Sequence, residues 1–123
     1  MTLAEGLLLA ARTVTGAAFL VIGLRNIASH GPISGAVGAA NLPFPKLLAA
    51  GGIAVQIGFG ALMMSGFYPV VAALGLLVFV IAATLIAHSF WTMAGEARQA
   101  NTGMFFANLI MAGGLLALVA AGF

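Results

Sequence analysis

Four long apolar runs dominate this chain of 123 residues. They cover approximately residues 7–27, 47–64, 68–88 and 104–121. A helix that crosses the hydrocarbon core of a bilayer needs about 20 apolar residues, so runs of this length are typical of transmembrane helices. The pattern therefore predicts an all-α fold, an integral membrane four-helix bundle with antiparallel neighbours, forming a single transmembrane domain over residues 1–123.

The composition indicates that lipid, rather than water, surrounds the chain. Hydrophobic residues make up 63% of the sequence and charged residues 5%, whereas a soluble domain carries about 25% charged residues. The 17 glycines fit a membrane bundle, because glycine lets helices approach closely in lipid. The net charge of +2 comes from scattered basic residues. Without a basic patch, we exclude nucleic acid as a partner and expect the lipid bilayer instead.

The connections between the runs predict an orientation. The first, residues 28–45, and the third, residues 89–103, are long, and we expect loops there on one side of the membrane. Arg25, Lys46 and Arg98 lie on that side. The positive-inside rule places these loops in the cytoplasm and both termini outside.

Polar residues of the first two runs share helical faces with glycines. Arg12 lies on one stripe with Gly16, Gly23 and Asn26, at spacings that repeat along a helix. It is either an arginine satisfied within the bundle or a contact for an anionic or carbonyl-bearing ligand. Gln56 lies between glycines at four-residue spacing. It either bonds across to a neighbouring helix or recognises a quinone carbonyl.

The last two runs carry polar residues near the long-loop side. Thr84, His88 and Trp91 share one helical face, and Asn101 and Asn108 share another. Trp91 is either a membrane-interface anchor, the usual role of tryptophan there, or a residue that stacks its indole on the head of a quinone. His88 is either a satisfied histidine at the edge of the bundle or a hydrogen-bond donor to a quinone oxygen or a partner subunit.

Several chemistries are disfavoured. The chain has no cysteine and two histidines, too few ligands for zinc. A haem would need both His30 and His88, and we expect His30 in a Gly/Pro loop that positions a ligand poorly. Glu5 and Glu96 are the only acidic residues, and neither lies within a run. The absence of an intramembrane carboxylate argues against a proton-coupled exporter, and no metal site is expected.

The sequence also resembles the DoxX family of small bacterial and archaeal membrane proteins, over about residues 8–122. The segments that carry the resemblance are A-A-R-T-V-T-G-A-A-F-L-V-I-G-L-R-N, V-Q-I-G-F-G-A-L-M-M-S-G, A-H-S-F-W and F-F-A-N-L-I-M-A-G-G-L-L-A-L. The resemblance implies a four-helix bundle in the bacterial inner (cytoplasmic) membrane. Family members are associated with thiosulfate:quinone oxidoreductase and with other membrane oxidoreductase assemblies.

The resemblance also implies particular residues. Arg12 looks like the family's first-span arginine, His88 and Trp91 like its H-x-F-W element, and Asn108 like its fourth-span asparagine. Gln56 departs from the family, because many members have an acidic residue there, so a role that needs a carboxylate does not carry over.

We therefore hypothesise an accessory or quinone-proximal subunit of a membrane oxidoreductase, rather than a self-contained catalyst. A quinone is the candidate cofactor, and partner subunits would supply the electron carrier. The alternatives are a non-enzymatic scaffold or assembly factor that docks partner helices, a homo-oligomer, and a small-molecule transporter. The candidate ligand-binding residues are Arg12, Gln56, His88, Trp91 and Asn108, with Asn26, Thr84 and Asn101 as secondary candidates.

Overall fold

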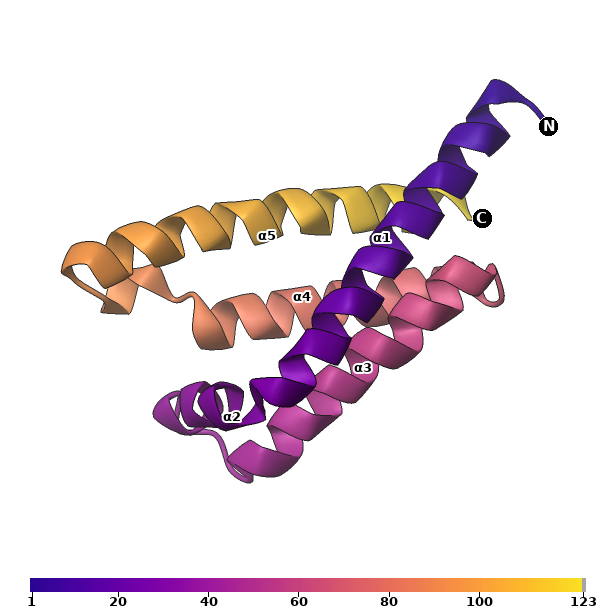
Figure 1. The fold of residues 1–123 in the computed structure, drawn as a ribbon. Helices are drawn as coiled ribbons and strands as arrows, with labels where there is room; N and C mark the ends of the chain where they lie inside the picture. Colours follow the sequence, from indigo (N-terminus) through magenta and orange to yellow (C-terminus); the bar gives the residue numbers. More distant parts are fainter. Residues whose placement is uncertain (123) are drawn as a thin grey trace.

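The computed structural model describes residues 1–122, and these form helices without any strand. The elements are α1 (Leu3–Ala28), α2 (His30–Ala39), α3 (Pro45–Ser65), α4 (Pro69–Ala87), the short 3₁₀ helix η1 (Phe90–Thr92) and α5 (Gly95–Ala121). Four helices, α1, α3, α4 and α5, are long and apolar enough to cross a membrane (Figure 1). The predicted all-α membrane bundle with four spans is confirmed.

Local sequence sets where these helices begin and end. The Thr2 hydroxyl oxygen accepts a hydrogen bond from the Glu5 backbone N–H at 3.1 Å and so caps α1. Pro45 and Pro69 begin α3 and α4, at a position where the missing N–H of proline has no helical partner to lose. Gly66 ends α3 with a φ of +82°, a conformation that glycine adopts readily. The chain can therefore reverse direction within a few residues.

The helices pack in sequence order. α1 lies mainly against α3, α3 against α4, and α4 against α5, while α2 packs chiefly on α3. In Figure 1 both termini and the α3–α4 turn lie at one end of the bundle, which we call the terminal end. α2 and the α4–α5 connection lie at the other, which we call the α2 end. Both long connections therefore lie on the same side.

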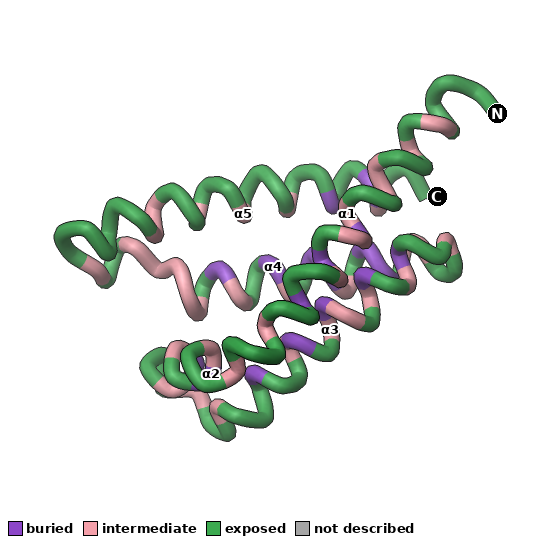
Figure 2. The backbone as a smooth tube through the Cα atoms, viewed as in Figure 1, coloured by how far each residue is buried: buried purple, intermediate pink, exposed green. Residues whose placement is uncertain are grey.

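An apolar core occupies the region where α1, α3, α4 and α5 meet. Figure 2 shows the buried segments on the facing sides of α1, α3 and α4, whereas most of α5 is exposed. The exposed residues include large apolar side chains such as Ile110, which is 78% exposed. Because lipid surrounds the spans, these outward side chains face acyl chains. The buried core residues are Phe19, Met63, Ala72, Ala73, Leu76, Leu77, Val80, Leu115 and Leu118.

Glycines bring α1 and α3 into backbone contact. A Cβ atom added to Gly16 would lie 2.6 Å from the Gly60 carbonyl oxygen, and one added to Gly60 would lie 2.9 Å from the Gly16 oxygen. Farther along, a Cβ on Gly23 would lie 3.0 Å from the Cβ of Gln56. Gln56 and Gly60 of the stripe predicted for the second span therefore face the stripe predicted for the first, whereas Gly52 faces Phe79 on α4.

The structure corrects the prediction that residues 28–45 form a loop. Residues His30–Ala39 form α2, although the segment is rich in glycine. Pro32 lies in its first turn, where a proline ring is tolerated. The Ser34 hydroxyl, buried, donates to the His30 carbonyl oxygen at 2.8 Å, and Val37 is buried as well. Packing on α3 therefore outweighs the weak helix propensity of this segment.

Two helices, α1 and α5, extend well beyond the apolar runs that predicted them. α1 begins at Leu3 and α5 at Gly95, and α5 includes the polar residues that precede the fourth run. Hydropathy marks the portion of a helix that lies in hydrocarbon, whereas backbone hydrogen bonding continues into the more polar region beyond it.

Candidate functional site

A cavity of about 520 Å³ lies among all five α-helices. Most of its lining is apolar, and α2 contributes Ile33, Ala36 and Val37. Four polar side chains also line it: Asn26, Gln56, His88 and Asn108. The structure therefore brings three of the five main candidate residues, and one secondary candidate, into a single cavity, which we call the five-helix pocket.

Asn26 and Gln56 form a hydrogen bond between α1 and α3. The Asn26 side-chain N–H donates to Gln56 Oε1 at 3.0 Å. Gln56 is only 5% exposed. Within the described residues 1–122, its amide nitrogen forms no further hydrogen bond. The Gln56 amide nitrogen therefore has a donor left over for a polar ligand or a water in the pocket.

Thr84 fixes the orientation of the Asn108 amide. The Thr84 hydroxyl donates to the Val80 carbonyl oxygen at 2.6 Å, so its proton is already used. Asn108, 3.0 Å from the same hydroxyl oxygen, must therefore donate through Nδ2. This assignment follows from the proton count, because a carbonyl oxygen only accepts. It leaves Asn108 Oδ1 as an acceptor available to a ligand.

His88 is held by Asn101 on α5. Asn101 Nδ2 donates to the Ala97 carbonyl oxygen at 2.9 Å, which orients Asn101 Oδ1 towards His88 Nδ1 at 2.7 Å. The proton of that bond must reside on His88 Nδ1. In the neutral ring the other nitrogen, Nε2, is then an acceptor. Asn101, a secondary candidate, thus acts by setting the tautomer of His88.

The amino-acid sequence that forms these four spans and the pocket is similar to those of known proteins. The family model for DoxX matches residues 7–89, more than half of the chain. The chain belongs to the DoxX family. This DoxX protein is 25% identical over 116 residues to the inner membrane protein YphA of Escherichia coli (strain K12). The matched residues make up 94% of this chain and 83% of YphA. No solved structure is significantly similar.

Several of the candidate residues lie within the part of the chain that matches the family model. It includes α1 through α4, and with them Asn26, Gln56, Thr84 and His88, and it ends before α5. The similarity to YphA extends over almost the whole chain and so reaches α5. An integral membrane protein of the DoxX family is therefore the assignment that these comparisons support.

Arg12 does not join the pocket. Its guanidinium lies beside Gly66, at the terminal end of the bundle: a Cβ added to Gly66 would lie 3.0 Å from Arg12 Nη1. The absence of a side chain at Gly66 thus gives the guanidinium its space. Arg12 and Asn26 share a helical face but not a site, because they lie about 20 Å apart along the helix axis at 1.5 Å per residue.

Trp91 lies in η1, outside the pocket lining. Its ring packs edge-to-face against Phe90 and Phe105, with centroids 5.4 and 5.8 Å away. The side chain is 52% exposed. An aromatic cluster at the end of a span is typical of a membrane-interface anchor. Trp91, the chain's single tryptophan, comes three residues after the pocket residue His88.

His30 begins α2 rather than lying in a loop. Its Nε2 donates to the Lys46 carbonyl oxygen at 3.0 Å and so ties α2 to the start of α3. Within residues 1–122, no group of three metal-binding side chains gathers.

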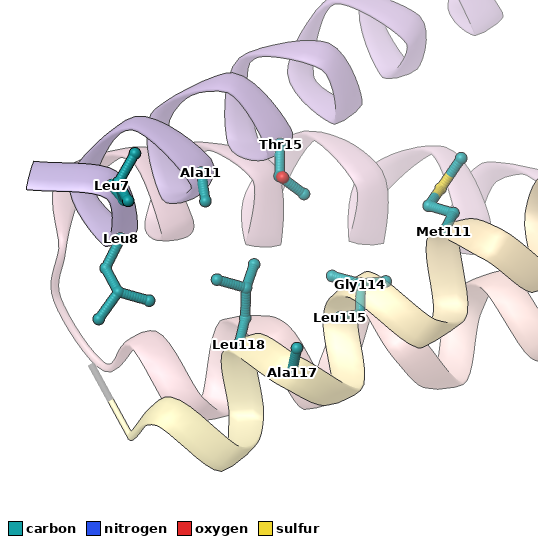
Figure 3. A pocket seen from close by; sticks show the side chains of 9 residues that line it. All are labelled: Leu7, Leu8, Ala11, Thr15, Met111, Gly114, Leu115, Ala117 and Leu118. Atoms are coloured by element: carbon teal, nitrogen blue, oxygen red, sulfur yellow. The ribbon is translucent and has the colours of Figure 1, made fainter. Parts of the chain in front are cut away.

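A second cavity, of about 420 Å³, lies between α1 and α5 near the terminal end. Figure 3 shows its lining from close by: aliphatic side chains, Met111 and a single hydroxyl, that of Thr15. It therefore offers space for an acyl chain and little to recognise a polar head.

Sequence reasoning missed the contribution of α2. Ile33, Ala36 and Val37 line the five-helix pocket, and they recur at i, i+3 and i+4, the spacing of one helical face. That periodicity was the available signal, and the surrounding glycines and Pro32 obscured it.

Proposed function

We propose that this DoxX protein binds the head of a quinone in the five-helix pocket, as an accessory, quinone-proximal subunit of a membrane oxidoreductase system. The observation that carries the proposal is the pocket itself: a cavity of about 520 Å³ with a mainly apolar lining to which Asn26, Gln56, His88 and Asn108 add polar side chains. A lipid-soluble molecule with a polar ring and a hydrocarbon tail matches that combination. Small-molecule sites in proteins usually combine an apolar wall with a few polar groups.

The chain's own residues can bind and orient such a molecule. Gln56, on α3, has donor capacity to spare for a ring oxygen. His88 and Asn108 provide polar atoms from α4 and α5, and Phe79 contributes an aromatic wall. The chain has no cysteine, so any thiol chemistry would reside on a partner subunit. An accessory role therefore fits these residues better than a self-contained catalyst.

The proposed location is the bacterial inner membrane. The four candidate spans and the relative YphA, described as an inner membrane protein, support it. The α2 end carries Arg25 in the last turn of α1, Lys46 near the start of α3 and Arg98 near the start of α5. We propose that this end faces the cytoplasm, following the positive-inside rule.

A scaffold that docks partner helices is the second candidate function. It is favoured by Gly113 and Gly114 on α5, where an added Cβ would meet nothing within 4 Å. Co-purification in mild detergent separates the two functions. A stoichiometric transmembrane partner without a quinone requirement supports the scaffold.

The quinone proposal can be tested with Trp91, the chain's single tryptophan. Decylubiquinone is titrated into the protein in lipid nanodiscs, and Trp91 fluorescence is followed. The proposal predicts saturable quenching, with affinity reduced about fivefold in Gln56→Met, the loss expected for one hydrogen bond. Gln99→Met, which removes the same group at an exposed position of α5, should bind as the wild type. Linear quenching, equal in all three proteins, contradicts the proposal.

A further inference from the structure

Two residues that line the five-helix pocket, Asn108 and His88, each carry an acceptor atom that a neighbouring residue defines. The Thr84 hydroxyl turns Asn108 Oδ1 away from itself. Asn101 holds the Nδ1 proton of His88, so Nε2 of the neutral ring carries a lone pair. Both residues line the cavity, one on α5 and the other at the end of α4. Neither acceptor has a hydrogen-bond partner within residues 1–122.

A quinone and a quinol differ in what they offer to such atoms. A quinone carbonyl only accepts hydrogen bonds, so against His88 Nε2 it would place one lone pair opposite another. A quinol hydroxyl both donates and accepts. It can donate to His88 Nε2 or Asn108 Oδ1 and still accept from the Gln56 amide.

We infer that the five-helix pocket prefers the reduced, hydroxyl-bearing form of its ligand, a quinol, over the corresponding quinone. This inference rests on the proposed function, because it specifies the redox form of the molecule bound at the same site. Acceptors that a bound ligand shields from water and leaves unsatisfied weaken binding, and the quinone leaves both acceptors unsatisfied. Each acceptor that gains a hydroxyl partner contributes about fivefold to the preference.

Asn101 is a positioning residue in this inference. It lies on α5 and touches His88 rather than the cavity. Without the Asn101 oxygen, the His88 ring is free to carry its proton on Nε2 and to donate to a quinone carbonyl. Asn101→Leu should therefore reduce the preference for the quinol while leaving a pocket that still binds.

The test compares decylubiquinol with decylubiquinone by equilibrium dialysis against protein-loaded nanodiscs at pH 8, with uptake by empty nanodiscs subtracted. Reductant keeps the quinol reduced and has no disulfide to attack, because the chain lacks cysteine. We expect the wild type to bind the quinol at least about fivefold more tightly. Asn108→Leu and Asn101→Leu should each reduce the preference, and Gln99→Leu should retain it. Retained helicity by circular dichroism shows that each variant is folded.

The outcomes separate this inference from the proposed function. Saturable binding of both forms with equal affinity, or tighter binding of the quinone, overturns the quinol preference and leaves the proposed function standing. Absence of saturable binding for either form overturns both. A lipid alcohol presents the same hydroxyl chemistry, so dioctanoylglycerol is included as a competitor. If dioctanoylglycerol displaces bound decylubiquinol more strongly than added decylubiquinol itself does, the assignment of the ligand to a quinol is overturned.

Discussion

The Asn26 amide on α1 donates a hydrogen bond to the Gln56 amide on α3 across 3.0 Å. The bond forms where Gly23 has no side chain, since a Cβ there would lie 3.0 Å from the Gln56 Cβ. Close backbone approach and polar pairing thus occur at the same point of the α1–α3 interface. The pair also forms part of the wall of the five-helix pocket, so one contact serves both the fold and the candidate site.

This bond should have a measurable coupling energy. A double-mutant cycle with Asn26→Leu and Gln56→Leu isolates it, because each single change removes the same contact. Interhelical hydrogen bonds in membrane proteins average about 0.6 kcal/mol and reach about 1.7 kcal/mol. We expect a coupling within that range, measured by unfolding in sodium dodecyl sulfate. Additive single effects would show that the two amides act independently.

The glycine contact between α1 and α3 should tolerate no side chain. Gly16→Ala places a methyl group 2.6 Å from the Gly60 carbonyl oxygen, and the backbones must separate. We expect a loss of about 1–3 kcal/mol in the free energy of unfolding, the range for overpacked sites.

Gly58→Ala is the matched control for this change. It lies on α3, and an added Cβ there meets nothing within 4 Å. We expect its stability to equal or exceed that of the wild type, because alanine favours the helix by up to about 1 kcal/mol. Equal destabilisation by Gly16→Ala and Gly58→Ala would contradict the close α1–α3 contact.

Trp91 should report the membrane interface. Because it lies beyond the end of α4, in a half-exposed aromatic cluster, lipids brominated near the headgroup should quench its fluorescence more than lipids brominated near the chain end. The double variant Trp91→Phe/Ile110→Trp moves the reporter to an exposed position within α5, and the order of quenching should reverse. The same depth profile for both proteins would refute the anchor interpretation.

The proposed orientation places both termini on the periplasmic side. An alkaline phosphatase fused after residue 123 should therefore be active in a bacterial host, and green fluorescent protein fused at the same point should be dark. Arg25, Lys46 and Arg98, all at the α2 end, provide the physical reason, because basic residues favour the cytoplasmic side. If instead the green fluorescent protein fusion were fluorescent and the phosphatase fusion inactive, the termini would lie in the cytoplasm and the α2 end outside.

The sequence predicts the four spans well because hydrocarbon imposes a simple requirement of length and apolarity. It also predicts the faces on which Asn26 and Gln56 meet, since residues four apart on a helix share a side. It fails at α2, where burial against α3 stabilises a glycine-rich helix whose composition indicates a loop.

Arg12 shows a second limit. Helical periodicity gives the face of a residue but not its neighbours across the bundle, so it could not separate Arg12, beside Gly66, from the pocket residues. The tautomer of His88 likewise depends on Asn101, thirteen positions away. Only the packing of α5 on α4 brings these two residues together.

Photolabelling tests the central claim, that the five-helix pocket holds a quinone-type head, most directly. A decylubiquinone that carries an azide on its ring is irradiated with the protein in nanodiscs, and the modified residues are mapped by mass spectrometry. The account predicts labels on pocket-lining positions of residues 48–56 and 79–88, which excess decylubiquinone removes. Labels confined to the lipid-facing Val78, Ile81 and Leu85, and insensitive to competitor, would contradict it.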